Sequence, residues 1–404
     1  MNDSAGWPTF QLSRISWAPI PSRAGPADAP IDPLESARVQ TLRGVACLLL
    51  VAFHAVGSTA ASGLHAGDDS PYRVFTNLFV HVRMPLFTFL SGLVYAGRPL
   101  RAGREWQFAR LKLRRLGVPL MVTATVLYLL HRAMHDEVPP LRQVWTIFVF
   151  PYWHLWFVQA LLLVFMVLVV LESLGALATA TRFAAVLACS VGLYFLGQFE
   201  GRDLAGMHNA TYLLPFFLWG LGAHRYRQLL RSRRALLVTV LCFVGAQGFH
   251  SYLVLTRAPA PLDPVAHRSL LNLVIGMSAS LAALQLLPRA RVMERVGGCS
   301  YPIYLYHPVF VAAVLTVAGG RIAQPTSVLF ATAVAAGVAG PMLMGALVRQ
   351  LPGGPLLLEG RSAPSAEAKG LGGRAVTGSL DPARPPAPAP SRARLFSWLG
   401  SDPG

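Results

Sequence analysis

Two residues of the first long apolar stretch have the types and the spacing to do chemistry. Arg43 stands where the stretch begins, and His54 follows eleven residues later. At a rise of about 1.5 Å per helical residue, eleven residues cover about 16 Å, roughly half of a hydrocarbon core about 30 Å thick. An imidazole at that depth is energetically unfavourable and usually faces a cavity. Two roles are open to His54, as a general base for a hydroxyl or as a nucleophile that carries a group transiently.

Further polar side chains interrupt the later apolar stretches. Any one of these histidines is also compatible with a core residue bonded to a backbone carbonyl, because polar groups join helices in membrane bundles. Four histidines and one arginine over four stretches instead favour a shared polar cavity, where bundle proteins place functional sites. The residues in question are His54, His81, Arg83, His154 and His307.

Residues 83–92 combine a proline with small residues. Pro85 leaves a backbone carbonyl unpaired and is expected to kink the helix. Ser91 and Gly92 remove bulk, so that another helix or a substrate can approach. Ser91 also offers a hydroxyl to a bound molecule.

Two later segments add aromatic and polar candidates. The cluster at residues 152–157 includes His154 and Trp156, and its tryptophans are compatible either with an interfacial belt or with a platform on which a sugar ring stacks. In residues 300–308, Tyr304 and His307 share one helix face with Ser300, at spacings of four and seven residues. This face forms a polar stripe on an otherwise apolar helix.

The composition of the chain is that of a membrane protein, whose helices must position the polar side chains named above. Of 404 residues, 54% are hydrophobic and 13% are charged, which is too apolar for an ordinary soluble domain. The apolar residues form blocks of about 17 to 25, long enough to cross a bilayer as helices. We therefore expect an all-α, polytopic integral membrane bundle of about ten transmembrane helices. The expected spans are residues 42–58, 74–96, 117–134, 154–171, 183–199, 211–224, 235–255, 268–287, 300–317 and 326–348.

Charge sets the expected orientation of the bundle. Lys and Arg number 35 against 18 Asp and Glu, a balance that by itself would suit a nucleic-acid partner. The basic residues gather, however, in short loops between alternate apolar blocks. Such an asymmetry places those loops in the cytoplasm. We expect both termini there, with the lipid bilayer as a partner and no nucleic acid.

Composition also divides the chain into three parts. Residues 1–33 are polar and Pro-rich, which predicts a flexible cytoplasmic segment and no cleavable signal peptide. Residues 34–350 hold the apolar blocks, and residues 351–404, rich in Pro, Ala and Arg, predict a disordered cytoplasmic tail. The four cysteines lack paired spacing, so neither a disulfide framework nor a zinc site is supported. His131 and His135 have a metal-binding spacing but no third ligand, so no metal is expected.

A basic cluster lies between the second and third expected spans. Topology and lipid head groups are sufficient to explain it. A nucleotide-bearing molecule such as coenzyme A would also require arginines at a cytoplasmic opening, to bind its phosphates. The candidate donor-binding residues are Arg110, Lys112, Arg114 and Arg115.

Four motifs, in order, resemble the membrane-bound acyltransferase-3 family over about residues 34–348. They are Leu42-Arg43-Gly44-Val45-Ala46 with His54, which matches an arginine-x10-histidine signature, then Met84-Pro85-Leu86-Phe87-Thr88-Phe89-Leu90-Ser91-Gly92, His154-Leu155-Trp156-Phe157 and Ser300-Tyr301-Pro302-Ile303-Tyr304-Leu305-Tyr306-His307-Pro308. This sequence departs from the family's basic RxxR motif. It is found either as Lys112-Leu113-Arg114-Arg115, with lysine first, or as Arg110 and Arg114 at a spacing one residue wider.

The resemblance implies a membrane O-acyltransferase. It implies transfer of an acyl group, expected to be acetyl, from acyl-CoA as co-substrate, with no tightly bound cofactor. The expected acceptor is a hydroxyl of a cell-envelope glycan or lipid-linked sugar, at a bacterial inner or plasma membrane. On this basis His54 is the catalytic histidine and Arg43 its partner. The candidates for acceptor or oxyanion contacts are Arg83, Ser91, His154, Trp156, Tyr304 and His307.

Three other functions remain open. A secondary metabolite is the main alternative acceptor. A flippase or transporter of a lipid-linked saccharide would also suit ten spans and a polar path, although the spans lack an inverted-repeat pattern and an Asp or Glu for ion coupling. A scaffold without catalytic activity would leave His54 and His307 unexplained.

Overall fold

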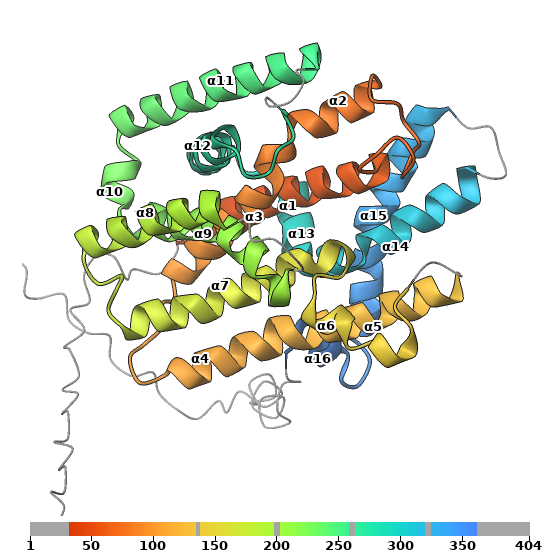
Figure 1. The fold of residues 1–404 in the computed structure, drawn as a ribbon, viewed down its shortest axis with the longest axis horizontal. Coiled ribbons are helices and arrows are strands. Elements are labelled where there is room, and N and C mark those ends of the chain that lie inside the picture. Colours follow the sequence, from red (N-terminus) through yellow and green to blue (C-terminus); the bar gives the residue numbers. More distant parts are fainter. Residues whose placement is uncertain (1–31, 135–137, 198–202, 258–262, 320–324, 362–404) are drawn as a thin grey trace, which may run out of the picture. The chain divides into compact units, whose positions relative to one another are not determined.

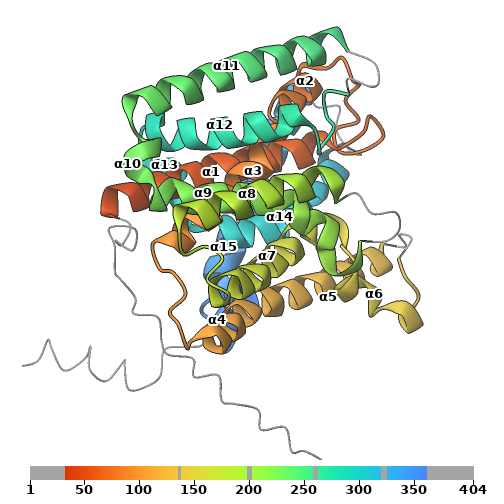
Figure 2. The ribbon, with the colours of Figure 1, turned by 60° about the vertical axis from the view of Figure 1, so that its left-hand side comes forward.

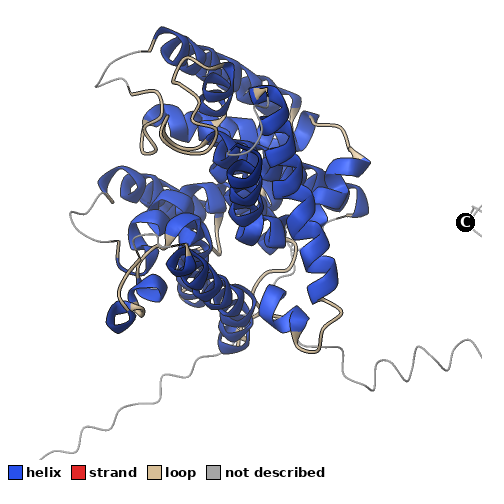
Figure 3. Ribbon diagram, turned by 90° about the vertical axis from the view of Figure 1, so that its right-hand side faces the viewer, coloured by secondary structure: helices blue, strands red, loops and turns tan. Residues whose placement is uncertain are grey.

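The computed structural model describes residues 32–134, 138–197, 203–257, 263–319 and 325–361. Every regular element in these ranges is a helix (Figure 1 and Figure 3). All of them belong to one unit, and residues 362–404 lie outside the described ranges. Residues 1–31 of the predicted N-terminal segment, most of the predicted tail and the positions of both termini therefore lie outside the described residues.

Ten of the described helices correspond to the ten predicted spans. They are α1 (Pro33–Val56), α3 (Val80–Ala96), α5 (Val118–Ala133), α7 (Trp156–Ser173), α8 (Ala180–Leu196), α9 (Met207–Arg225), α11 (Arg233–Thr256), α12 (Leu270–Leu286), α14 (Ser300–Gly319) and α15 (Thr326–Val348). Shorter elements join them: α2 (Pro71–Leu78), α4 (Glu105–Lys112), η2 (Leu113–Gly117), η3 (Leu141–Gln143), α6 (Thr146–Val149), η4 (Trp153–Leu155), η5 (Leu204–Gly206), α10 (Arg227–Leu230), α13 (Arg291–Gly298) and α16 (Gly354–Glu359).

Within the described ranges, seven helical segments are long and apolar enough to cross a membrane. The chain is therefore a polytopic helical membrane protein. The three remaining predicted spans correspond to α8, α9 and α12. Of these, α8 and α12 are apolar but have 17 residues each, which gives a length of about 25 Å.

Helix α1 begins at Pro33 rather than at residue 42, where the apolar stretch begins. The Asp32 side chain accepts a hydrogen bond from the Glu35 amide at 2.7 Å, and proline occupies the first helical position. Both features favour a helix start, but neither is apolar, so the hydrophobic pattern did not reveal it. As a result Arg43 lies in the middle of α1, and His54 lies in its last turn.

The helices pack most closely where glycines face a neighbouring backbone. A Cβ atom on Gly92 of α3 would lie 1.9 Å from the Phe217 carbonyl oxygen of α9, and one on Gly220 would lie 1.9 Å from the Phe89 oxygen. The prediction that Gly92 allows another helix to approach is confirmed, and that helix is α9. On the other side of α3, α12 packs between α3 and α11 (Figure 2).

The basic stretch after α3 is helical rather than a loop. Helix α4, the π turn η2 and α5 follow one another without a break from Glu105 to Ala133. A π turn inserts one residue into the helical repeat, and such turns are frequent at functional sites. Here it lies in the basic cluster, at Arg114 and Arg115.

The predicted tail begins too early. Residues 354–359 form α16, which packs on α5 and α15. Gly360 adopts a left-handed conformation with φ of +61°, and a Cβ there would lie 2.1 Å from the Arg114 carbonyl oxygen. Glu359 also pairs with Arg349 at 2.7 Å. These contacts join the segment up to Arg361 to the bundle, although its Pro- and Gly-rich composition resembles that of a linker.

Candidate functional site

Three histidines from separate elements meet at one end of α1. His54 comes from the last turn of α1, His154 from η4 before α7, and His307 from α14. The distance between ring centroids is 4.7 Å for His54 and His307, 5.4 Å for His154 and His307, and 6.1 Å for His54 and His154. The structure therefore brings together three of the four histidines that the sequence predicts at a shared polar cavity, from distant parts of the chain.

Backbone carbonyls determine which nitrogen of each ring carries its proton. His307 Nδ1 lies 2.9 Å from the Ile303 oxygen and 3.0 Å from the Tyr304 oxygen, so this nitrogen donates. The other nitrogen of His307, Nε2, then accepts a hydrogen bond from His54 Nδ1 at 3.1 Å. The same His54 Nδ1 lies 3.0 Å from the Leu50 oxygen. Because the His54 proton is held on Nδ1, Nε2 of a neutral His54 has a free lone pair.

Such a free lone pair is what a general base requires. His154 differs, because its Nε2 donates to the Leu305 oxygen at 3.0 Å and its Nδ1 has no partner among the described residues. The Tyr304 hydroxyl donates to the His154 carbonyl oxygen and so fixes the turn that carries this histidine.

A cavity of about 400 Å³ opens next to this cluster, a volume in the range of small-molecule sites. His54, Arg83, His154, Trp156 and Tyr304, all predicted as site residues, line its wall. The remaining lining residues are Leu50, Phe53, Val80, Met84, Pro151, Trp153, Asn209, Tyr212, His267 and Arg268.

Three of the predicted residues, His307, Ser91 and His81, are not in the wall. His307 is fully buried and is hydrogen-bonded to His54, which lines the cavity. The Ser91 hydroxyl donates to the Phe87 oxygen of its own helix at 2.9 Å, and Ser91 does not line the cavity. His81 forms a separate pair with His250, at 4.6 Å between ring centroids, and donates to the Pro264 oxygen at 2.8 Å.

The sequence reasoning missed Tyr212, His267 and Arg268. Arg268 begins the eighth predicted span, where an arginine is readily explained as a topology signal. It lies, however, on the side of the membrane opposite the basic loops, where the charge asymmetry disfavours arginine. This unexpected position is the sequence feature that could have identified Arg268 as a site residue. Burial, together with the neighbouring Arg83 guanidinium, lowers the pKa of His267, while Asp263 opposes that shift. The lowered pKa favours the neutral form of His267.

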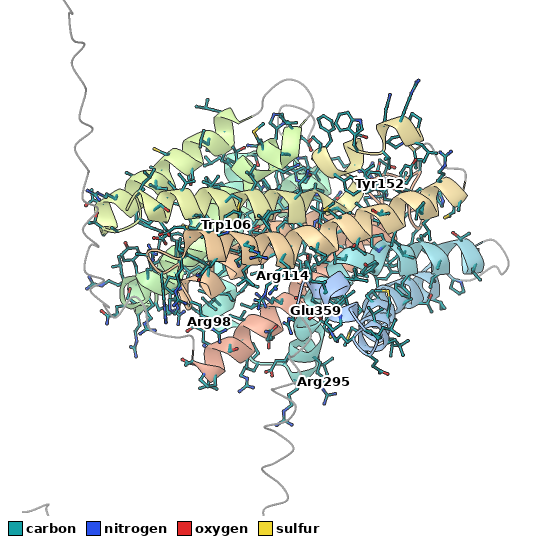
Figure 4. The ribbon with its side chains drawn as sticks, turned by 90° about the horizontal axis from the view of Figure 1, so that it is seen from below. Arg98, Trp106, Arg114, Tyr152, Arg295 and Glu359 are labelled. Carbon is teal, nitrogen blue, oxygen red and sulfur yellow. The ribbon has the colours of Figure 1, made fainter. Side chains whose placement is uncertain are left out.

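The predicted donor-binding residues lie on α4 and η2. Figure 4 labels one of them, Arg114. Lys112 places its ammonium 3.6 Å from the centroid of Phe165 and 5.2 Å from that of Phe108. Arg43 and Arg115 lie close enough to act on it electrostatically. Arg115 in turn is close to Arg98, Arg114 and Arg361, whereas Arg110 is exposed on α4.

Arg43 therefore belongs to the basic cluster and not to the histidine cavity. The eleven residues between Arg43 and His54 separate the two sites by about 16 Å along α1. No group of three or more His, Cys, Asp and Glu side chains in the described residues could hold a metal ion.

A family model described as "Acyltransferase domain", that of acyltransferase 3, matches residues 37–346. The chain belongs to this acyltransferase-3 family. The match includes every motif on which the sequence resemblance was based, from Arg43 to His307. Neither a curated protein nor a solved structure matches the chain. This acyltransferase therefore combines a family domain with a basic cluster and a histidine-lined cavity at two positions along α1.

Proposed function

We propose that the protein is a membrane O-acyltransferase that moves an acyl group, acetyl in the first instance, from acyl-CoA to a sugar hydroxyl. The acceptor is a cell-envelope glycan or its lipid-linked precursor. The observation that carries this proposal is the free Nε2 of His54 at a cavity of about 400 Å³, with its Nδ1 proton held by Leu50 and His307. The family membership supports the reaction class.

The reaction requires proton transfer at one nitrogen. The acceptor hydroxyl oxygen attacks the thioester carbonyl carbon while His54 Nε2 takes the hydroxyl proton. The resulting oxyanion collapses, the carbon–sulfur bond breaks, and the leaving thiolate takes the proton back from His54. The products are an ester and a thiol, and His54 returns to its neutral form.

Neighbouring groups stabilise the charges that arise in these steps. His54 is an imidazolium while it holds the proton, and its Nδ1–H donates more strongly to His307 Nε2 and to the Leu50 oxygen in that state. Preorganised donors near the carbonyl oxygen act on the oxyanion. The positive charge of the cavity wall, which comes from Arg83 and Arg268, suits such a role.

The basic cluster supports the choice of donor. Arginines and a lysine at the opposite part of α1 suit the phosphates of a nucleotide-bearing thioester. About 16 Å of helix separates Arg43 from His54, so the donor must have an extended arm that carries the acyl group. Coenzyme A has such an arm between its phosphates and its sulfur.

Trp153 and Trp156 support a sugar as the acceptor. Both line the cavity, and Trp153 also stacks on His131 with 3.9 Å between ring centroids. Flat aromatic faces pack well against the apolar faces of sugar rings. The interfacial-belt interpretation accounts for exposed tryptophans, but it does not account for their position beside His54.

The test uses membranes that contain the protein, radiolabelled acetyl-CoA, and an extract of glycans and lipid-linked sugars. We expect label on an acceptor with the wild type and His250→Ala, and none with His54→Ala. His250 is the matched control because it is a buried histidine outside the cavity. Equal labelling by His54→Ala would refute the role of His54. Label confined to a small secondary metabolite would change the acceptor class, and movement of unmodified substrate across the membrane without labelling would favour a flippase.

A further inference from the structure

Arg83 is a buried cation without an anionic partner among the described residues. It is 6% exposed, and its Nη1 has no hydrogen-bond acceptor there. Burial of an unpaired charge is strongly unfavourable. Other arginines in this bundle follow the usual pattern, since Arg225 bonds Glu172 at 2.7 Å and the buried Arg73 donates to the Gly57 carbonyl oxygen. Arg83 can therefore bind a ligand that carries a negative charge.

The contact with Phe53 does not replace such a ligand. The Arg83 guanidinium carbon lies 3.4 Å from the Phe53 ring centroid, a cation–π contact. A guanidinium has five N–H donors in one plane, and the face of a single ring cannot accept all of them. The remaining donors form the planar fork that binds carboxylates and phosphates in two-point contacts.

The cavity around Arg83 has an excess of positive charge. Its wall, in the described residues, contains two arginines and no Asp or Glu. The second arginine, Arg268, donates to the Tyr194 carbonyl oxygen at 2.6 Å and to the Thr211 hydroxyl at 3.0 Å. Asp203, the acid near Arg268, is already bonded to the amide groups of Asn209. The charge at Arg83 therefore remains uncompensated.

Arg83 lies where it can bind the acceptor, and it lies away from the residues that suit the phosphates of the donor. Arg83 lines the same cavity as His54 and Trp156, whereas the basic cluster that suits donor phosphates lies around Lys112. Phe53 contacts both Arg83 and His54, since its ring centroid is 5.2 Å from that of His54. A saccharide on the tryptophan wall thus has the base and the guanidinium within one cavity.

We propose that the acceptor is an acidic saccharide, whose carboxylate or phosphate binds Arg83 while one of its hydroxyls lies at His54. This inference rests on the proposed function, which it deepens by naming the acceptor class. An anionic group fixed at Arg83 also orients the sugar, because a two-point contact allows few rotations of the ring.

The test measures binding to purified protein in lipid nanodiscs at constant ionic strength. The probes are methyl β-D-glucuronide, glucose 6-phosphate and, as the neutral match, methyl β-D-glucoside. Tryptophan fluorescence reports binding, because Trp153 and Trp156 line the cavity. The variants are Arg83→Gln, Arg83→Lys, which keeps the charge, and Arg142→Gln, which replaces an exposed arginine outside the cavity.

We expect at least one acidic probe to bind the wild type and Arg142→Gln about ten- to a hundredfold more tightly than the glucoside, the range for a charged hydrogen bond. Arg83→Gln should lose this preference, and Arg83→Lys should keep part of it. The tighter of the two acidic probes identifies the anion as a carboxylate or a phosphate. Equal binding of all three probes to the wild type, or no binding of any, would overturn the proposal, as would an unchanged preference in Arg83→Gln.

One further variant separates this proposal from the proposed function. His54→Ala should keep the preference for the acidic probe while it loses acyl transfer. If the wild type acylates neutral and acidic sugars equally well, the acidic acceptor is refuted and the acyltransferase function stands. If the preference is present but no acyl transfer depends on His54, the function fails and the anion site stands.

Discussion

His307 should act on the reaction through His54, and His307→Ala tests this in quantitative terms. The substitution removes the acceptor that lies 3.1 Å from His54 Nδ1. While His54 holds the acceptor proton, this hydrogen bond involves a charged donor, a class that contributes about 1.5–3 kcal/mol. Its loss should lower kcat by about ten- to 150-fold. The Leu50 oxygen remains 3.0 Å from the same nitrogen, so the effect should stay below that of His54→Ala.

The assay compares kcat and the KM for acetyl-CoA in the wild type, His307→Ala, His307→Gln and the control His250→Ala. We expect kcat to fall in His307→Ala while the KM for the donor changes by less than about twofold, as for the loss of an interaction made mainly in the transition state. Gln keeps an acceptor atom at a similar reach, so His307→Gln should recover part of kcat. A general loss of packing would not be rescued in this way.

Two results would refute the reasoning. Wild-type kcat in His307→Ala would show that the hydrogen bond to His54 has no part in the reaction. A loss in His307→Gln as large as that in His307→Ala, in protein that stays folded, would show that His307 contributes volume rather than an acceptor.

Three further predictions test the packing, the donor cluster and Ser91. Gly92→Ala should destabilise the protein by about 1–3 kcal/mol, the range for overpacking, because its Cβ would lie 1.9 Å from the Phe217 oxygen. Gly245→Ala, with open space around its Cβ, should not lower the midpoint of thermal unfolding, and equal midpoints for both variants would contradict the close α3–α9 contact. Lys112→Ala should raise the KM for acetyl-CoA about tenfold with little change in kcat, and an unchanged KM would remove Lys112 from the donor site. Ser91→Ala should keep kcat and both KM values, because its hydroxyl bonds within its own helix, and a large drop in kcat would return Ser91 to the site.

Periodicity and apolar length were sufficient to locate the ten helices, because each predicted span overlaps one helix of the structure. They could not fix helix ends that depend on polar groups. The start of α1 depends on the Asp32 cap, and α16 depends on contacts of Glu359 and Gly360 with distant residues. The sequence predicts a loop for the basic stretch, because its charges conceal the helix that continues through η2 into α5.

The site was partly predictable for a related reason. His54, Arg83, His154 and Tyr304 stand out as polar groups within apolar stretches, and the structure places all four at one cavity. Ser91 has the same appearance in the sequence, but its hydroxyl is satisfied within α3. The resemblance paired Arg43 with His54, whereas the structure places Arg43 near Lys112 in the basic cluster and His54 at the cavity. Tertiary contacts decide such cases, and a sequence motif does not reveal them.

The proton-accepting role of His54 is tested most directly by a single turnover with purified protein and acetyl-CoA, in which thiol release and ester formation are measured together. The wild type and His250→Ala should form ester and free thiol in equal amounts, and His54→Ala should form neither above the background rate. Ester formation by His54→Ala at the wild-type rate would contradict the assignment of His54 as the catalytic base.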